Sequence, residues 1–360
     1  MGLLRETSAR ENSATVLTVV LSVGFVILYS LAFPRTLGHE LFLVPDSVAS
    51  LSEDLTSPLQ PGGRFFELAG REGYWDSQGR LLRAQPQRPQ SVSSGDRMAW
   101  YDASLDSVTV EGTQGVLFRI KGQKYPFWSG GQLYAMDENR LGLTAYDVQG
   151  QLLWTKQFSS LISAVDSAAG LTAVGTLDGR VQTFDAKGAT PGPFVPGGSR
   201  VPVVYNVALS HDGKRMLVLA GVDPKRFLML EKGGSDFRPI FHKPLSENKP
   251  WPTWLGFLDD SLGYHEAEGA VAVSKVGDSS GETILPFDGV LGDVHFLTDR
   301  RLVLLMSGTG DRHTVQVDSL EGQAVLRLTF QAKEVLFAPT AKQFLLGLDQ
   351  SLLTLQVKYQ

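Results

Sequence analysis

The chain has 360 residues, of which 42% are hydrophobic, with 38 Gly, 18 Pro and no Cys. The lack of cysteine excludes disulfides, thiolate metal sites and cysteine nucleophiles. The net charge of −5 argues against a nucleic-acid surface, because phosphate binding needs clustered Lys and Arg, and the sequence contains no such cluster.

The first predicted element is a membrane-spanning helix over residues 15–33. This stretch carries no charge, and a helix of that length, at about 1.5 Å per residue, extends roughly 30 Å, the thickness of the bilayer hydrocarbon. A cleaved signal peptide and a buried core helix are the alternatives. The stretch is longer than the apolar region of a usual signal peptide, and no small-residue cleavage site follows it.

The orientation of this helix follows from the flanking arginines. Arg5 and Arg10 precede the helix and only Arg35 follows it closely, so the positive-inside rule makes residues 1–14 a short cytoplasmic tail. We therefore expect a single-pass protein of the inner membrane. It contacts the lipid bilayer through residues 15–33, and the bulk of the chain is periplasmic.

Residues 34–61 are predicted to be a linker, because Pro34, Pro45, Pro58 and Pro61 interrupt any regular element. Residues 40–44, with the sequence ELFLV, are an exception. They form a short β-prone run that could pair with another part of the fold.

From residue 62 to 360 the chain repeats one unit at steps of about 35 to 47 residues. An apolar residue leads into Asp or Glu, a Gly follows three or four places later, and an apolar run closes the unit, as in residues 145–154, AYDVQGQLLW. Self-similarity at this period is typical of a stacked supersecondary unit of the size of a propeller blade. The acidic positions are Asp76, Glu111, Asp147, Asp185, Glu231, Asp278 and Asp318.

Upstream of the acidic position, two apolar runs flank a tight polar turn, as in residues 207–219. Each unit thus predicts two inner strands joined by a hairpin, a third strand ending at the acidic residue, and an outer strand after the Gly. Residues 352–357 belong to an eighth unit that lacks its outer strand. Because open sheet edges invite aggregation, residues 40–44 are predicted to donate that strand. We expect eight blades, or seven if residues 64–85 merge with the last blade.

Two parts of the repeat region resemble known propeller units. Residues 143–156 and 173–185 resemble the PQQ-like, or quinoprotein-type, β-propeller repeat, and residues 209–216 are similar to a WD40-type hairpin. The resemblance implies an all-β propeller over residues 62–360, preceded by the N-terminal transmembrane helix. Such repeats identify architecture better than function.

The resemblance implies two kinds of function. Quinoprotein dehydrogenases hold pyrroloquinoline quinone over a calcium ion, but their adjacent cysteine pair cannot exist in a chain without Cys, and no acidic calcium site is recognisable. The other branch consists of non-catalytic propellers of the cell envelope, similar to the BamB lipoprotein of outer-membrane assembly, which bind partner proteins. This chain lacks their lipid-bearing cysteine and has a predicted anchor instead.

The sequence indicates no catalytic residue, no cofactor and no metal site. Residues 277–281, GDSSG, approximate the surroundings of a serine-protease nucleophile, but Asp278 and Gly281 are the repeat's own positions, which indicates a strand connection. The six histidines show no pairing at i, i+2 or i, i+4, so a zinc site would need a coincidence over long range.

Aromatic residues at blade junctions give the remaining functional signal. Trp251 and Trp254 lie in a proline-stiffened connector, and Tyr125, Phe127 and Trp128 lie at another junction. Rigid exposed aromatics are favoured anchors of protein interfaces, so these five are candidate partner-binding residues. The alternative is that they pack between neighbouring blades.

We therefore expect a membrane-anchored, non-catalytic propeller that acts as an interaction scaffold and binds a protein partner in the cell envelope. The alternative is a propeller enzyme or small-ligand binder, related to quinones or sugars, with its site in the central channel. Such a protein would gather carboxylates, His or Arg at the channel mouth, whereas a scaffold would show an apolar patch rimmed by charge on one face.

Overall fold

The computed structural model describes residues 22, 23, 25 and 28, and residues 41–359 apart from 102–105, 123, 247–252, 278–280 and 340–342. The chain divides into one unit of residues 43–357 and another of residues 1–42 with 358–360. In the latter, residues 22, 23, 25 and 28 are α-helical. No helix within the described residues combines the length and apolar character that crossing a membrane takes. The other residues of the predicted span 15–33 lie outside the described ranges.

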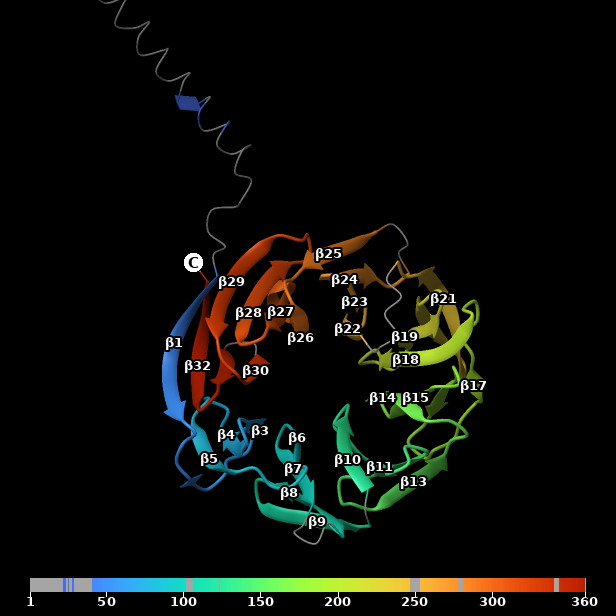
Figure 1. Ribbon diagram of the computed structural model, residues 1–360, viewed down its shortest axis with the longest axis horizontal. Helices are drawn as coiled ribbons and strands as arrows, with labels where there is room; N and C mark the ends of the chain where they lie inside the picture. The colour runs from blue at the N-terminus through green and yellow to red at the C-terminus, as the bar shows by residue number, and fades with distance from the viewer. Residues whose placement is uncertain are drawn as a thin grey trace, which may run out of the picture. The chain divides into compact units, whose positions relative to one another are not determined.

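The unit of residues 43–357 is a ring of eight four-stranded sheets, the blades (Figure 1). We number the blades in chain order. Blades 2 to 7 each consist of four consecutive strands that run in chain order from the centre outward. Blade 2 contains β6 (Val92–Ser94), β7 (Arg97–Tyr101), β8 (Ser107–Gly112) and β9 (Gly115–Lys121); blade 3 contains β10 (Lys124–Ser129), β11 (Gln132–Asp137), β12 (Gly142–Tyr146) and β13 (Leu152–Gln157); blade 4 contains β14 (Ile162–Ala168), β15 (Leu171–Thr176), β16 (Val181–Phe184) and β17 (Pro193–Phe194).

The next three blades follow the same order. Blade 5 contains β18 (Val201–Leu209), β19 (Arg215–Val222), β20 (Arg226–Gly233) and β21 (Asp236–Pro244); blade 6 contains β22 (Leu255–Asp259), β23 (Leu262–Ala267), β24 (Ala270–Lys275) and β25 (Glu282–Pro286); blade 7 contains β26 (Val290–Leu297), β27 (Leu302–Thr309), β28 (Arg312–Ser319) and β29 (Ala324–Gln331). A 3₁₀ turn, η1 (Thr298–Arg300), joins β26 to β27.

Blades 1 and 8 are each completed by an N-terminal strand. Blade 1 contains β3 (Arg64–Leu68), β4 (Arg71–Trp75), β5 (Leu81–Pro86) and, outermost, β2 (Leu55–Thr56); blade 8 contains β30 (Val335–Pro339), β31 (Gln343–Leu348), β32 (Ser351–Tyr359) and, outermost, β1 (Leu41–Ser50). The all-β fold with eight blades is confirmed, and the seven-blade alternative is wrong. Residues 41–44 of the run predicted at 40–44 begin β1, and residue 40 lies outside the described residues. The segment expected to be a linker supplies two strands.

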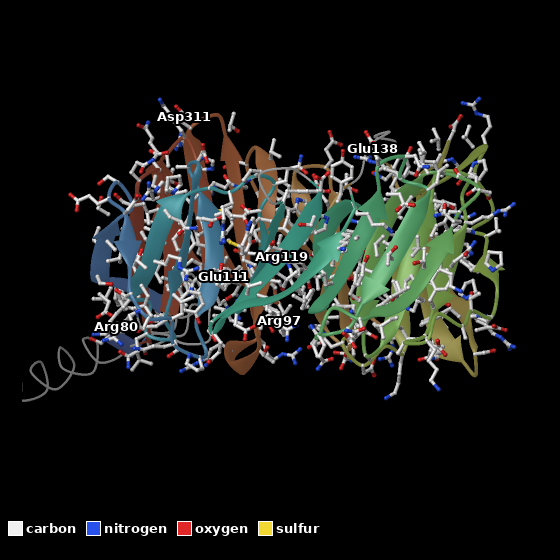
Figure 2. The ribbon with its side chains drawn as sticks, turned by 90° about the horizontal axis from the view of Figure 1, so that it is seen from below. Arg80, Arg97, Glu111, Arg119, Glu138 and Asp311 are labelled. Carbon is white, nitrogen blue, oxygen red and sulfur yellow. The ribbon has the colours of Figure 1, made fainter. Side chains whose placement is uncertain are left out.

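Blade 1 differs from the predicted unit. Asp76 follows β4, the second strand of its blade, and Arg80 ends the same turn. Figure 2 shows Arg80 at the same end of the ring as Arg97, which is the first residue of β7. Both β4 and β6 therefore run toward this end of the ring. Because β3 is antiparallel to β4, it runs opposite to β6. Blade 1 therefore lacks the first strand of the other blades and gains β2 at its outer edge.

Three of the acidic repeat positions close the same turn. In each, one carboxylate oxygen accepts hydrogen bonds at 2.8 or 2.9 Å from the backbone N–H groups two and four residues later. The Gly three residues on has a φ of 78° or 79°, a left-handed conformation in which glycine is not strained. These residues are Asp76, Asp147 and Asp185.

The other acidic positions have other roles. In blade 7 the turn is closed by Ser319, whose Oγ accepts from the N–H groups of Glu321 and Gln323 at 3.2 and 3.3 Å. Asp318 instead lies buried in β28. Glu111 forms ion pairs with Arg83 on β5 and with Arg88, which follows β5. Glu231 lies within β20, and Asp278 is outside the described residues.

The hydrophobic core is distributed between neighbouring blades. Buried clusters join blades 1 and 2, 2 and 3, 3 and 4, 4 and 5, 5 and 6, 6 and 7, and 8 and 1. The last of these closes the ring. It includes Leu51, which follows β1 and is fully buried.

Candidate functional site

The inner hairpins of blades 4 to 7 border two adjoining cavities of about 450 and 400 Å³. The two cavities share His211 and Phe257, and we call them together the hairpin cleft. Its lining comes mainly from β14, β18, β22 and β26, the innermost strands of four successive blades. Residues from separate repeats thus meet at one surface because the ring brings their hairpins side by side.

The lining of the hairpin cleft includes apolar side chains from three blades. They are Val165 on β14, Phe257 on β22, and Val294 and Phe296 on β26. Val165 and both Phe side chains are half-buried, so part of each faces solvent. A concave surface with partly exposed aromatic rings is typical of binding sites.

The polar part of the cleft is acidic. Asp166, Asp259 and Asp260 line it, together with His211 and His295. Neither Lys nor Arg is found among the described lining residues. The cleft therefore has a negative potential at neutral pH, which favours a cationic partner.

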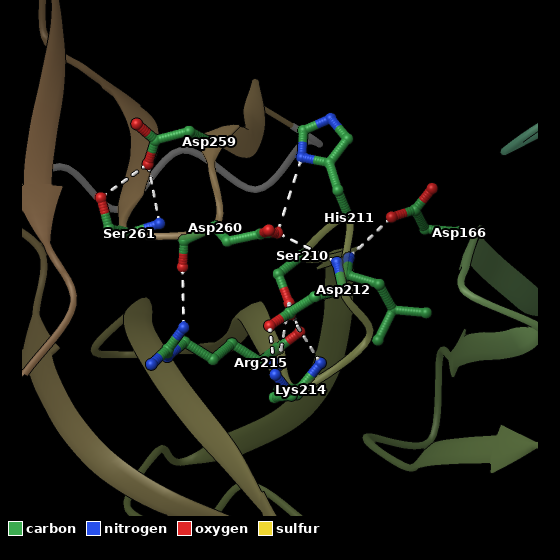
Figure 3. Close-up of polar contacts among 10 residues, drawn as sticks. Asp166, Ser210, His211, Asp212, Lys214, Arg215, Asp259, Asp260 and Ser261 are labelled. Atoms are coloured by element: carbon green, nitrogen blue, oxygen red, sulfur yellow. Dashed lines mark hydrogen bonds and ion pairs between the residues drawn. The ribbon is translucent and has the colours of Figure 1, made fainter.

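Asp166 connects three blades. Its Oδ1 accepts a hydrogen bond from the Ser129 hydroxyl of blade 3 at 3.0 Å, and its Oδ2 accepts one from the backbone N–H of Leu209 of blade 5 at 2.7 Å. Burial raises the pKa of Asp166, and these hydrogen bonds oppose the rise. The carboxylate is thus held in one orientation at the cleft (Figure 3).

Asp260 makes a similar connection between blades 6 and 5. Its Oδ1 accepts a hydrogen bond from the backbone N–H of Asp212 at 3.0 Å and lies 3.8 Å from His211 Nδ1. Its carbonyl accepts from Arg215 at 2.9 Å (Figure 3). Hydrogen bonds from Lys214 N–H and the Ser210 hydroxyl lower the pKa of Asp212 to about 2. The hairpins that carry the cleft are therefore tied to each other by carboxylate-to-backbone bonds.

His295 is oriented by a neighbour on its own strand. Its Nε2 lies 2.8 Å from Asp293 Oδ2, which places a further carboxylate beside the cleft. Across the described part of the chain, no three His, Asp or Glu side chains are grouped so that they could hold a metal ion. The arrangement offers apolar contacts and negative charge for binding.

A family model described as "beta-propeller protein" matches residues 10–359. The chain belongs to this family. This β-propeller protein is 23% identical to an uncharacterized protein of Treponema pallidum (strain Nichols) over 326 residues, which cover 90% of the chain and 85% of the relative.

Two solved structures illustrate the similarity of the fold. BamB from Moraxella catarrhalis matches the β-propeller protein with a TM-score of 0.57 at 12% identity, over 88% of this chain and 100% of BamB. A chain of the Mitotic Checkpoint Complex matches with a TM-score of 0.55 at 12% identity, over 89% and 94%. At such low identity the similarity shows the fold alone.

The structure places the predicted partner-binding residues of the β-propeller protein apart from the hairpin cleft. Tyr125, Phe127 and Trp128 lie on β10. Tyr125 is 46% exposed, Phe127 stacks on Tyr134 with ring centroids 5.5 Å apart, and Trp128 Nε1 donates to the Val92 carbonyl at 3.4 Å. They sit together on one strand, and only one of the three is exposed.

The tryptophan pair is only partly described. Trp254 is half-buried, and its Nε1 donates to the Leu291 carbonyl of blade 7 at 2.9 Å. Trp251 lies outside the described residues. Neither Trp254 nor the aromatic residues of β10 line the hairpin cleft.

Sequence reasoning missed the cleft itself. His211 and Asp260 belong to hairpin tips that the sequence identified only as turns, and Asp166 carried no signal. One clue was available in the sequence: His211 lies at the inner hairpin of blade 5, and Asp259 and Asp260 lie at the inner hairpin of blade 6. The ring places the inner hairpins of successive blades side by side.

Proposed function

We propose that this protein is a non-catalytic interaction scaffold of the cell envelope, anchored in the inner membrane by residues 15–33, which binds a protein partner through the hairpin cleft. The observation that carries the proposal is the cleft, where four apolar side chains and three carboxylates line one surface without a basic residue among its described lining. Apolar side chains beside charged groups form the kind of surface that a protein partner needs. The carboxylates and histidines gathered at the inner hairpins would also suit the alternative function, a small ligand at the channel mouth.

The cleft chemistry defines the segment that fits. Phe257 and Phe296 would accept an apolar side chain, and Asp166, Asp259 and Asp260 would attract Lys or Arg next to it. Charged groups at such a site mainly set the orientation and the association rate, while the buried apolar contact supplies affinity. The partner segment is therefore an apolar residue flanked by basic residues.

Two resemblances support this class of function. The PQQ-like resemblance of residues 143–156 and 173–185 extends to non-catalytic propellers of the envelope, and the fold is similar to that of BamB. The 360 residues contain no cysteine that could carry a lipid. The predicted spanning helix would hold the propeller at the membrane in its place.

A pair of double variants tests the cleft. Phe257→Ala with Asp259→Lys removes an aromatic and reverses a charge in the cleft. The matched control, Tyr125→Ala with Glu138→Lys, makes the same changes elsewhere; Glu138 lies at the ring end opposite Arg97 (Figure 2). Affinity capture with the detergent-solubilised full chain is expected to recover a specific protein with the control and to lose it with the cleft variant.

Equal thermal unfolding midpoints would establish that both double variants are folded. Loss of the partner with the control and retention with the cleft variant would refute the cleft and favour the aromatic residues of β10. Recovery of no specific protein with the unmodified chain would refute the scaffold function.

The membrane placement has a separate test. In spheroplasts, protease added outside is expected to digest the propeller, because the predicted anchor directs residues 34–360 to the periplasmic side. Immunodetection of a C-terminal tag measures this, with a cytoplasmic protein as the protected control. A propeller that resists digestion until the membrane is lysed would contradict the orientation.

A further inference from the structure

A second pair of cavities lies between blades 5 and 6 and shares no lining residue with the hairpin cleft. Their volumes are about 280 and 230 Å³, and both contact Lys243 and Glu282. The ion pair between these two side chains links β21 to β25. We call the 280 Å³ cavity the interblade cavity.

A buried lysine lines the interblade cavity. Lys225, in the connection between β19 and β20, is 2% exposed. Its ammonium group donates to Thr253 Oγ1 at 3.2 Å and lies 4.7 Å from the centroid of the Tyr205 ring. A buried ammonium keeps its charge only where its surroundings stabilise it. The Thr253 hydroxyl and the Tyr205 ring are among the groups that stabilise the Lys225 ammonium beside this cavity.

His265 lies beside this charge. The imidazole is 1% exposed and stacks on Phe227 with ring centroids 4.6 Å apart. Its Nδ1 is buried and has no hydrogen-bond partner among the described residues. Glu282 Oε1 is 4.0 Å from it, beyond hydrogen-bonding distance. The cavity is thus lined by a residue with a buried polar atom that no described residue satisfies, and such atoms call for an explanation.

Burial is the main influence on the protonation of His265. Burial and the charges of Lys243 and Lys225 lower the pKa of His265 to about 4, and Glu282 acts in the other direction. Two further acidic residues line the cavity. Glu268 is exposed, and Glu266 accepts a hydrogen bond from the backbone N–H of Trp254.

The remaining lining is largely apolar. Pro244, Leu245, Ala272 and Ile284 contribute to it. A ligand with one charged end and an apolar body matches this division, whereas a fully hydrated inorganic ion leaves the apolar wall without a partner.

We propose that the interblade cavity binds a small organic carboxylate, whose oxygens accept hydrogen bonds from Lys225 Nζ and His265 Nδ1 and whose apolar body packs on Leu245, Ala272 and Ile284. The carboxylate would satisfy the unpartnered imidazole nitrogen. The site requires neither the protein partner nor the membrane anchor proposed above.

Titration calorimetry on the detergent-solubilised full chain tests the site with three probes. Benzoate is expected to bind at one saturable site, its neutral analogue benzamide is expected not to bind, and inorganic phosphate is expected to bind more weakly than benzoate. Lys225→Met should weaken benzoate binding by about tenfold or more, the effect of losing one charge-assisted hydrogen bond. Lys232→Met, at an exposed position of the same blade, is the matched control and should bind as the unmodified chain does.

His265→Phe gives a second variant in case Lys225→Met does not fold. It keeps the ring stacking and removes the nitrogen, so it should also weaken benzoate binding. The proposal is overturned if benzoate shows no saturable binding, if benzamide binds equally well, or if the folded variants retain full affinity. Tighter binding of phosphate than of benzoate would overturn the assignment to an organic carboxylate.

Discussion

Replacing Leu51 by Ala is expected to lower the free energy of unfolding by about 2–5 kcal/mol, the range for truncating a buried leucine. Leu51 is fully buried and packs in the cluster with Phe66 of blade 1 and with Leu345 and Leu352 of blade 8. Denaturant unfolding measures the change. Val48→Ala in β1 is the control, because Val48 is 68% exposed. Similar losses in the two variants would contradict the role assigned to Leu51.

The size of this effect follows from where the ring closes. Blades 8 and 1 are held together by residues distant in sequence, and their direct polar contacts are few among the described residues. The Thr354 hydroxyl donates to the Gly79 carbonyl at 3.2 Å, and the Ala69 N–H donates to Glu334 at 2.9 Å. The apolar cluster around Leu51 therefore supplies much of the closure.

The blade architecture could be predicted because its signal is local. The Asp147 turn consists of one carboxylate, two backbone N–H groups and one glycine within five residues. A short stretch of sequence therefore contains every group that forms the turn. The prediction was inaccurate where another residue performs the same task. Ser319 replaces the neighbouring Asp318 as acceptor in blade 7, since a hydroxyl oxygen can accept the same bonds.

Blade 1 could not be predicted in detail for a topological reason. Its outer strand β2 has two residues, too few to produce an alternating pattern. The missing first strand likewise leaves no positive signal. Pairing partners separated by the whole chain, such as β1 and β32, are fixed by closure of the ring.

The candidate sites depend on contacts between repeats. Asp166, His211 and Asp260 lie on three different blades and meet only because inner hairpins of adjacent blades are neighbours. In the same way, the sequence could not tell that the indole of Trp254 faces a carbonyl of blade 7. Whether a side chain is exposed to solvent depends on how the blades pack in the ring, and residue type alone does not determine it.

Two buried groups give the propeller opposite pH dependences. The native state keeps His265 neutral down to a pKa of about 4, whereas an unfolded histidine has a pKa near 6.5. The unfolded state therefore binds the extra proton between these values, and stability falls as the pH is lowered through this window. Burial and the nearby Glu72 raise the pKa of Glu67 from 4.5 to about 7. The native state then holds the extra proton, and stability falls as the pH is raised from 4.5 to 7.

Replacing His265 by Phe is expected to remove the first of these dependences. Relative to the unmodified chain, the variant should gain of the order of 3 kcal/mol as the pH is lowered from 7 to 4, because one pKa unit corresponds to about 1.4 kcal/mol. Denaturant unfolding at a series of pH values measures this difference, from which the contribution of Glu67 cancels.

Glu67→Gln is the matched variant with the opposite sign. Its stability relative to the unmodified chain should improve as the pH is raised from 4.5 to 7, because the amide has no proton to lose. A His265→Phe profile parallel to that of the unmodified chain would mean that the imidazole is not held neutral in the native state.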